Sequence, residues 1–467
     1  MEQGEKGVFS QSRDQRIEKH LWLLRQEYRI RNQYRGDVNE VGVPFSFIHA
    51  ADLHLDSPFK GLTKAPEAVQ ARLRESTFAA LRNLCGLVGR EKVDFVVIAG
   101  DLFDAADRSL RAQLRLERAL REMTEQGAQV FVVHGNHDPE SGRRARLEWP
   151  QGVRVFGTSQ VECNTAHTHS GEIAAHIYGI SYSTPAVTDN LALRFKKKEG
   201  APFHIALLHA NVDGDPAHDN YAPCKLDELS SVGFDYWALG HVHDRRTLRE
   251  YPHVVYPGNL QGRSVRETGG KGAYAVSVSE TGEVDMRFHD LADVLWQEIA
   301  VEIDGIEREQ ELRDLMLEEL EEARRQAGGR PVLARIRLEG RGAMHERLFD
   351  DGMTEVWLEE LRECLEPPES TEAWIWPESI AVRTKGSIKL EQAAEEDGFL
   401  GELLRRGISA ALLPESSKEL LDEAAESLRR QPKIREWLES RSHGERELWI
   451  RQAMELSAAL LRDEDAG

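Results

Sequence analysis

Between residues 45 and 290, apolar positions fall into short runs that alternate with longer segments of helical period. The runs of strand length cover residues 45–50, 93–100, 128–135, 203–210 and 234–241. Residues 68–88 and 109–127, which lie between the first three runs, repeat apolar residues at the spacing of a helix face. Buried strands that alternate with helices predict an α/β domain with a central β-sheet flanked by helices.

Beyond residue 290 the pattern changes twice. Residues 291–387 follow the order strand, helix, strand, helix, strand, which predicts a small α/β domain. Its expected strands are 296–303, 332–340 and 374–384, and its expected helices are 307–326 and 354–365. Residues 388–467 repeat apolar residues only at spacings of three and four, which predicts a helical C-terminal region.

The first 42 residues are polar and mixed in charge, which is typical of a loosely attached or disordered extension. A second interpretation is that translation begins near Val41 or Val43, because the first expected core strand starts directly afterwards. Detecting peptides from residues 1–40 in the native protein would exclude it.

Length and cysteine usage narrow the class of protein. A chain of 467 residues exceeds the roughly 250–300 residues of a single core, so several domains are expected. We expect no membrane span, because no run of about 18 apolar residues occurs. The four cysteines lie far apart without a C-x-x-C pair, which argues against a disulfide framework or a structural zinc site. This usage favours the reducing cytoplasm.

The formal charge of −21 is unevenly distributed. Residues 43–290 hold 28 Lys and Arg against 32 Asp and Glu, whereas residues 291–467 hold 24 against 42. Such an acidic chain is a poor candidate for binding nucleic acid over its whole surface. A local basic face, or bound metal ions, could still attract a phosphate group.

Metal-ligating side chains follow each of the five expected strands of the first domain. They are Asp52 and His54; Asp101 and Asp104; Asn136, His137 and Asp138; His209; and His241 and His243. Ligands of open α/β sheets gather at the carboxyl ends of strands, so these residues are expected to converge. In an extended backbone, D-x-H and H-x-H would each place two ligands on one face.

The ligand types point to a pair of metal ions. Carboxylate, amide and imidazole ligands without a thiolate suit Mn²⁺, Fe²⁺ or Zn²⁺. Seven ligands drawn from these ten residues are too many for one catalytic ion, whereas two ions about 3.5–4 Å apart, bridged by a carboxylate, would use them. His134, at the end of an expected strand, is interpreted as a packed or hydrogen-bonded structural residue.

The set "DLH", "GDLFD", "GNHD", "H" and "GHVH" resembles the motifs of the calcineurin-like metallophosphoesterase superfamily over residues 45–290. The resemblance implies that one metal is held by Asp52, His54, Asp101 and His243. It implies that Asp101 bridges to the second metal, whose site is completed by Asn136, His209 and His241. It implies that His137 faces the scissile phosphate and protonates the leaving oxygen. Asp138 is then expected to orient His137.

The stretches "FIHAADLHLDSPFKGL" and "YPGNLQGRS" are similar to the DNA repair nuclease branch, which is SbcD-like, and most of all to bacterial YhaO-type exonucleases. This implies a nuclease domain at 43–290, a small α/β capping domain at 291–387 and a C-terminal helical region at 388–467. It also implies a DNA exonuclease, 3′→5′ with some endonuclease activity, that uses two divalent ions, with Mn²⁺ favoured over Fe²⁺ or Zn²⁺. A homodimer and an SbcC-like coiled-coil ATPase bound by the C-terminal helices are the implied partners, although those helices could instead pack on their own domain.

The DNA-contacting residues are less sharply specified. Asn259, Gln261 and Arg263 follow an expected strand and are predicted to contact phosphate, which would position DNA without reading its sequence. The basic runs at 194–200 and 143–146 are either further contacts or solvated faces.

Two alternatives remain open. A stand-alone phosphatase or cyclic-nucleotide phosphodiesterase would explain the acidic surface but not the additional domains. A non-enzymatic scaffold conflicts with the complete set of ligands.

Overall fold

The computed structural model describes residues 42–59, 62, 65–104, 109–142, 148–348, 352–365, 373–386 and 389–465. These residues form two compact units. The first holds the described parts of Met1–Lys60, Ala71–Arg263 and Gly270–Asp293, and the second those of Gly61–Gln70, Ser264–Gly269 and Val294–Gly467. The extension expected over residues 1–42 therefore lies outside the described residues, apart from Gly42.

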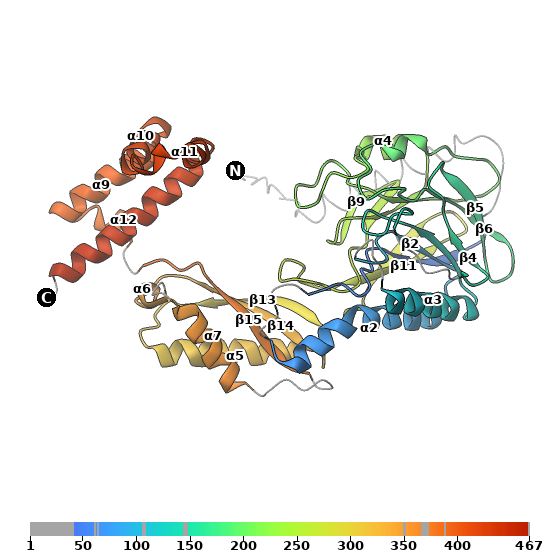
Figure 1. Cartoon of the computed structure of the whole chain (residues 1–467), viewed down its shortest axis with the longest axis horizontal. Coiled ribbons are helices and arrows are strands. Elements are labelled where there is room, and N and C mark those ends of the chain that lie inside the picture. Colours follow the sequence, from blue (N-terminus) through green and yellow to red (C-terminus); the bar gives the residue numbers. More distant parts are fainter. Residues whose placement is uncertain are drawn as a thin grey trace, which may run out of the picture. The chain divides into compact units, whose positions relative to one another are not determined.

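Two six-stranded sheets form the first unit (Figure 1). The first sheet has the order β12 (Val284–Asp290), β11 (Gly272–Val278), β1 (Phe45–Ala50), β2 (Phe95–Ala99), β3 (Gln129–Val133) and β4 (Val153–Val155). The second has the order β5 (Glu162–His167), β6 (Ile173–Gly179), β7 (His204–His209), β8 (Tyr236–Gly240), β10 (His253–Tyr256) and β9 (Arg246–Glu250). Strands β1 to β4 are parallel, as are β6, β7, β8 and β10. The antiparallel strands β5, β9, β11 and β12 complete the sheets at their margins.

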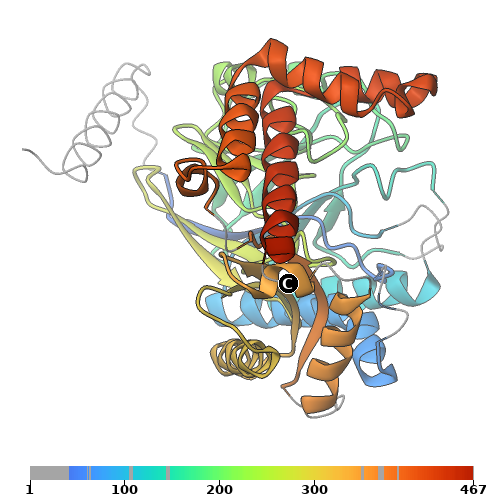
Figure 2. The same ribbon diagram turned by 90° about the vertical axis from the view of Figure 1, so that its left-hand side faces the viewer.

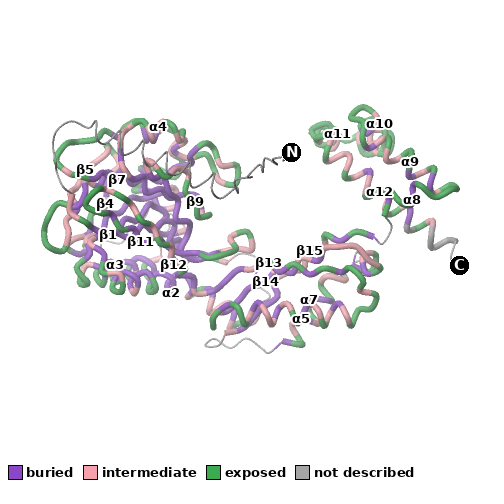
Figure 3. Tube along the Cα trace, turned by 180° about the vertical axis from the view of Figure 1, so that it is seen from behind, coloured by how far each residue is buried: buried purple, intermediate pink, exposed green. Residues whose placement is uncertain are grey.

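The two sheets pack face to face through an aromatic core. The Phe47 ring stacks on Phe95 of its own sheet at 5.1 Å and meets Tyr236 of the other sheet edge-on at 5.2 Å. Figure 3 shows the central strands as a continuous buried block. All five residues of β2 are buried, which explains why the sequence there reads as an unbroken apolar run.

Helices cover the outer faces of both sheets. Apolar residues of α2 (Glu67–Glu91) and α3 (Leu110–Glu125) share one buried cluster with the first sheet. Residues of the short helices η1 (Leu191–Arg194) and α4 (Leu226–Ser231) share another with the second. The result is a layered α/β sandwich.

The second unit begins with a three-stranded parallel sheet in the order β13 (Leu295–Glu302), β14 (Val332–Glu339) and β15 (Ile375–Val382). The connecting helices are α5 (Glu309–Gln326), α6 (Met344–Leu348) and α7 (Met353–Cys364). Helix α5 buries Leu312, Met316 and Leu320, which are spaced at one turn.

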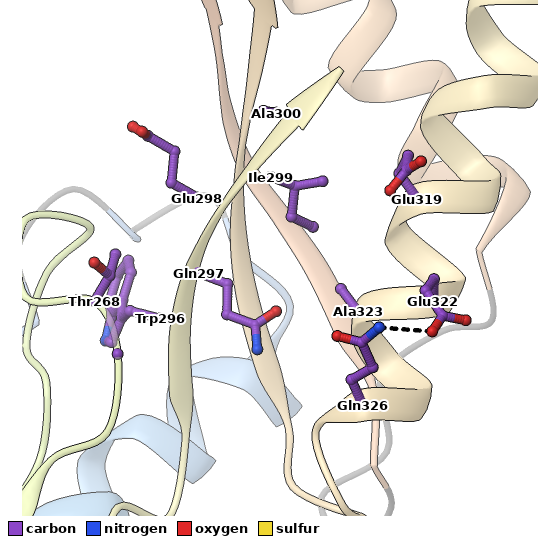
Figure 4. Close-up of a pocket in the computed structure, with 11 residues that line it drawn as sticks. Thr268, Trp296, Gln297, Glu298, Ile299, Ala300, Glu319, Glu322, Ala323 and Gln326 are labelled. Carbon is purple, nitrogen blue, oxygen red and sulfur yellow. Dashed lines mark hydrogen bonds between the residues drawn. The ribbon is translucent and has the colours of Figure 1, made fainter. Parts of the chain in front are cut away.

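A cavity of about 440 Å³ lies between β13 and α5 (Figure 4). Glu319 and Glu322 of α5 line it, and Gln326 donates a 2.6 Å hydrogen bond to Glu322. Its described lining holds no histidine, cysteine or aspartate, so it offers few of the ligands that a transition metal prefers.

The C-terminal region is helical, as Figure 2 shows in orange to red. It comprises α8 (Leu390–Ala393), α9 (Phe399–Leu412), α10 (Pro414–Ala424), η2 (Leu428–Arg430), α11 (Pro432–Glu439) and α12 (His443–Asp465). Leu404 and Ala411 of α9 pack in one cluster with Ile450, Met454 and Ala458 of α12.

The predicted fold class, α/β with sheets flanked by helices and a helical C-terminal region, is confirmed. The structure adds strands that the sequence reading did not list, among them β5, β9 and β12. These marginal strands are largely half-buried or exposed, so they lack the apolar runs that marked the central strands. Among the described residues, no helix combines the length and apolarity needed to cross a membrane. The domain boundaries drawn from the sequence remain predictions.

Truncating the inter-sheet aromatic core should destabilise the protein. Phe47→Ala is expected to lower the free energy of unfolding by roughly 3–5 kcal/mol, because it leaves a cavity between the sheets. Urea denaturation, monitored by circular dichroism, measures this free energy. Leu193→Ala, at a side chain that is 64% exposed, is the control and should change the value by no more than about 0.5 kcal/mol. Equal stability of both variants would contradict this account of the core.

Candidate metal centre and active site

The predicted ligands converge because the ends of the central strands are bonded to one another beyond the regular sheet. After β1, the backbone N–H of Asp52 donates to the carbonyl of Gly100 at 3.1 Å, and that of His54 donates to Asp101 at 3.0 Å. From the second sheet, the N–H of His241 donates to both carboxylate oxygens of Asp52 at 3.1 Å. The motif loops of the two sheets are therefore fixed against each other.

Left-handed backbone, rather than extended backbone, aims these ligands. The φ angles are 51° at Asp52, 43° at His54, 48° at Asp101 and 104° at His241. The expectation that D-x-H would follow the two-residue repeat of a strand is thus wrong, since β1 ends at Ala50. Such conformations are costly for residues with a Cβ and tend to occur at functional sites.

Two glycines allow the close approach of these segments. A Cβ at Gly135 would overlap the Asp101 carboxylate and lie 2.8 Å from the His209 ring. A Cβ at Gly240 would overlap the carbonyl of Ala99. Any larger residue would push the ligand-bearing loops apart.

One set of ligands consists of Asp52, His54 and His243, whose ligand atoms lie within 4.8 Å of one another. The Nε2 atoms of His54 and His243 face each other at 3.1 Å. Asp52 and His54 are buried and His243 is half-buried, so the set opens to one side.

The other set forms around His209. Its Nδ1 donates to the carbonyl of Ala99 at 2.9 Å, which leaves the Nε2 lone pair directed toward the Asn136 side-chain oxygen at 3.0 Å. Asp101 lies between the two sets, with Oδ2 3.7 Å from His54 Nε2 and 3.5 Å from His209 Nε2. This is the position that a bridging carboxylate needs.

His241 completes this set from the second sheet. Its ring lies 5.2 Å from that of His209, centroid to centroid, and its Nε2 donates to the carbonyl of Asp219 at 2.7 Å. Nδ1 is therefore the nitrogen left for a metal.

Burial sets the protonation of these groups. Desolvation raises the pKa of Asp101 to about 6, and it lowers the pKa of His209 to about 4 and that of His241 to about 3. The two imidazoles are thus neutral near pH 7, the form that binds metal. A buried carboxylate that resists ionisation gains most from a nearby cation, so the donor set fits two divalent ions.

His137 stands at the open side of the site. Its Nδ1 donates to the carbonyl of Asp104 at 2.7 Å, and its backbone N–H donates to Asp101 Oδ1 at 2.9 Å. The side chain is 40% exposed and lines a cavity of about 280 Å³ together with Asp101, Asn136, Pro216, Ala217, His218, Asp219, His241 and His243. The ring is held while Nε2 is left for a substrate.

Asp138 has a different partner from the one expected. Its Oδ2 pairs with His134 Nδ1 at 2.9 Å and accepts from the N–H of Leu102 at 3.1 Å, while Oδ1 accepts from the N–H of Gly135 at 2.7 Å. The prediction that Asp138 orients His137 is wrong, because the Asp104 carbonyl does so. His134 is buried and hydrogen-bonded, in line with its structural interpretation.

Two residues support the site without belonging to the predicted ligand sets, although Asp104 was among the ligand-type residues noted after the expected strands. The Asp104 carboxylate lies 3.1 Å from His54 Nδ1, so a negative charge stands directly beside a histidine of the predicted ligand set. Lys271 is buried and donates from Nζ to the carbonyl of His243 at 3.0 Å. The only signals in the sequence were the position of Asp104 three residues after Asp101 and the glycines on both sides of Lys271.

The three predicted substrate contacts lie in one loop but differ in access. Asn259 and Gln261 are buried, and their amides donate to the carbonyls of Gln261 and Gly262, respectively. Both therefore organise the loop, and the prediction that they contact phosphate is wrong. Arg263 pairs with the Asp104 carboxylate and lies 3.4 Å from His243 Nδ1, beside the predicted metal ligands.

The structure describes only one of the two basic runs. Residues 143–146 lie outside the described residues. Lys196, Lys197 and Lys198 are exposed, which agrees equally with a DNA contact and with a solvated face, so both interpretations of this run stay predictions.

Two family models match the chain. The model for calcineurin-like phosphoesterases matches residues 45–245, and the model described as "Metallophosphoesterase YhaO, middle domain" matches residues 296–385.

Relatives agree with these matches. The chain is 39% identical to "Uncharacterized metallophosphoesterase YhaO" of Bacillus subtilis over 77% of its own length and 86% of the relative. It is 28% identical to "DNA double-strand break repair protein Mre11" of Thermoplasma acidophilum over 55% of its length and 68% of the relative. A solved dimetal phosphatase from Danio rerio aligns at 16% identity with a TM-score of 0.32, covering 50% of this chain and 93% of that one.

Adding a Cβ at Gly135, where the loop lies against Asp101 and His209, should weaken metal binding. Gly135→Ala is expected to lower the Mn²⁺ affinity at least tenfold, because the new Cβ displaces Asp101 or His209. Isothermal titration calorimetry measures this affinity. Gly444→Ala, where a Cβ meets no atom within 4 Å, is the matched control. Unchanged Mn²⁺ affinity in Gly135→Ala would show that the loops can part without cost.

Acid should destabilise the metal-free protein. Burial lowers the pKa of His49 and His241 to about 3 and of His209 and His253 to about 4, so these rings take up protons below pH 6.5 only on unfolding. Asp101 has the opposite effect. Because burial raises its pKa from 3.8 to about 6, its contribution to the free energy of unfolding is lost as the pH rises through this range. Four histidines outweigh one carboxyl group, so the unfolding free energy should fall between pH 6.5 and 4, by roughly 1.4 kcal/mol per pH unit for each uncompensated proton.

Urea denaturation in the presence of EDTA across this pH range measures the slope. A free energy of unfolding that stays constant or increases on acidification would contradict the assigned neutral state of the buried histidines.

Proposed function

Because this chain belongs to the YhaO-type family of calcineurin-like metallophosphoesterases, we propose that it is a DNA exonuclease of DNA repair that uses two divalent metal ions. The observation that carries the proposal is the convergence of the seven predicted metal ligands, four of which line a cavity together with His137. Mn²⁺ is the ion that we propose, with Fe²⁺ or Zn²⁺ as alternatives. Cleavage from 3′ to 5′, with some endonuclease activity, and action in the cytoplasm belong to the same proposal.

The residues divide the chemistry among them. When bound, the two ions would supply Lewis acidity and activate water for attack on phosphorus. Asp52, His54, Asp101 and His243 would hold one ion, with Asp101 shared, and Asn136, His209 and His241 would complete the other site. His137, whose Nδ1 is fixed by the Asp104 carbonyl, would deliver a proton from Nε2 to the leaving oxygen.

Support for DNA as the substrate comes from relatives and from the loop after β10. The Mre11 proteins that match this chain are named for double-strand break repair. Arg263 stands beside His243 and could exchange its pairing with Asp104 for a bidentate contact to a DNA phosphate.

The runner-up is a stand-alone phosphatase or cyclic-nucleotide phosphodiesterase. A specific observation favours it: the described lining of the cavity includes no lysine or arginine that would follow a polyanion. The same metal site would serve both reactions, so substrate choice must be measured.

Partners form the last part of the proposal. We propose a homodimer that works with an SbcC-like coiled-coil ATPase bound through the C-terminal helices. Large apolar side chains support such docking, since Phe399 of α9 is 73% exposed, and Leu456 and Leu460 of α12 are 62% and 60% exposed.

The deciding experiment offers end-labelled DNA and bis(4-nitrophenyl) phosphate to the Mn²⁺-loaded protein. We expect Mn²⁺-dependent degradation of DNA, and a loss of about 10²–10⁴-fold in His137→Ala, because a general acid contributes that much. Metal content should survive in His137→Ala and fall in Asp101→Ala.

His169→Ala serves as the control, because that histidine is 43% exposed and pairs with Asp94 rather than with a predicted ligand. Turnover of small phosphoesters with inert DNA would establish the runner-up. Full activity of His137→Ala would refute the role given to His137.

A further inference from the structure

Besides His137 and four of the predicted metal ligands, a further histidine, His218, lines the cavity. Its ring centroid lies 5.4 Å from that of His241 and 5.2 Å from that of His243. The His137 ring, in contrast, contacts His54 at 5.0 Å. The His137 imidazole thus lies beside the predicted ligand histidine of the first sheet, and the His218 imidazole lies beside two of the three predicted ligand histidines of the second sheet.

The loop that carries His218 is held by a buried side chain. Asn211, which is fully buried, accepts from the N–H of Asp215 at 2.7 Å through Oδ1. Its Nδ2 donates to the carbonyls of Asp215 and Asp219, both at 3.2 Å. The amide therefore closes residues 215–219 into a compact loop of defined shape.

Two further contacts fix this loop to the site. The Asp219 carbonyl accepts from His241 Nε2 at 2.7 Å, and the Asp215 carboxylate pairs with Arg246 of β9. These bonds place the half-buried His218 ring at the cavity rather than in bulk solvent.

The lining of the cavity leaves few groups that can bind an anion. Its described residues include no lysine or arginine. Four of its polar side chains are predicted metal ligands, namely Asp101, Asn136, His241 and His243. Apart from the predicted metal ligands, the side chains of this described lining that carry an N–H group are those of His137 and His218. An imidazole N–H at the edge of a dinuclear site is suited to a phosphoryl oxygen.

We propose that His218 binds the substrate directly, by donating a hydrogen bond to an oxygen of the phosphoester beside His241 and His243, while His137 serves the leaving oxygen. His218 is a substrate-positioning residue for the phosphoester, and this inference rests on the proposed function only in taking a phosphoester as the substrate.

Three substitutions separate hydrogen bonding from ring packing. His218→Phe keeps a ring against His241 and His243 but has no donor, His218→Gln keeps a donor but no ring, and His218→Ala removes both. We expect kcat/KM for bis(4-nitrophenyl) phosphate to fall about 10–100-fold in the Phe and Ala variants, as for a lost bond to a charged group. His218→Gln should stay within about threefold of the wild type.

Binding of inorganic phosphate to the Mn²⁺-loaded protein gives a readout without turnover. Calorimetry should show the Kd for phosphate rising in parallel with the loss of kcat/KM, while mass spectrometry shows an unchanged metal content. His169→Phe is the matched control and should leave both quantities unchanged.

Several outcomes would overturn the inference. Wild-type behaviour of His218→Phe with impairment of His218→Gln would make the ring a packing element, and a loss of metal in proportion to activity would make it a support for His241. Unchanged phosphate binding in all three variants would also overturn it. Inert DNA with diester cleavage that depends on His218 would refute the proposed DNA substrate and leave this inference standing.

Discussion

The burial of Asp52 and Asp101 at the junction of two sheets is the constraint on which the rest of the site depends. Two carboxylates that lose water this close together must be compensated by positive charge or by donors. The backbone N–H groups of His137 and His241 provide part of that compensation, and divalent cations would provide the remainder. Bringing these groups together requires a strained left-handed backbone at Asp52 and Asp101. It also requires a residue without a Cβ at Gly135.

Much of this arrangement could be predicted from the sequence because the central strands are buried on both faces. Their apolar runs located β1, β2, β3, β7 and β8, and the polar residues after each run had to meet at one edge of the sandwich. The marginal strands were less visible since their partly solvated faces carry polar residues. The partner of Asp138 could not be predicted either. Its bond to His134 depends on how a tight loop closes, and the spacing of residues in the sequence does not determine that. Asn259 and Gln261 were misjudged because a polar residue in a loop can serve the loop's own carbonyls. No sequence pattern indicated a role for His218, since its position depends on how the buried amide of Asn211, seven residues earlier, closes the loop.

The distribution of charge around the cavity also explains how an acidic protein could handle a phosphoester. Its described walls offer imidazoles, an amide and carboxylates, so attraction of an anion would come mainly from bound metal. Arg263, held by Asp104, is a mobile positive charge only if that carboxylate is satisfied otherwise, for example by His54. Discrimination between a diester in DNA and a small phosphoester would then rest on surfaces around the cavity rather than on the metal ligands.

The hydrogen bond from His241 to the Asp219 carbonyl joins the ligand shell to the loop that carries His218. A bond shared in this way would link metal binding at His241 thermodynamically to anion binding at His218. If metal binding sharpens the orientation of His241, it also orders the loop, and an anion that orders the loop must raise the affinity for metal by the same factor. Metal uptake and phosphate uptake would then be cooperative, so a protein that is short of metal would also release its anions readily, which would limit unproductive capture of phosphates.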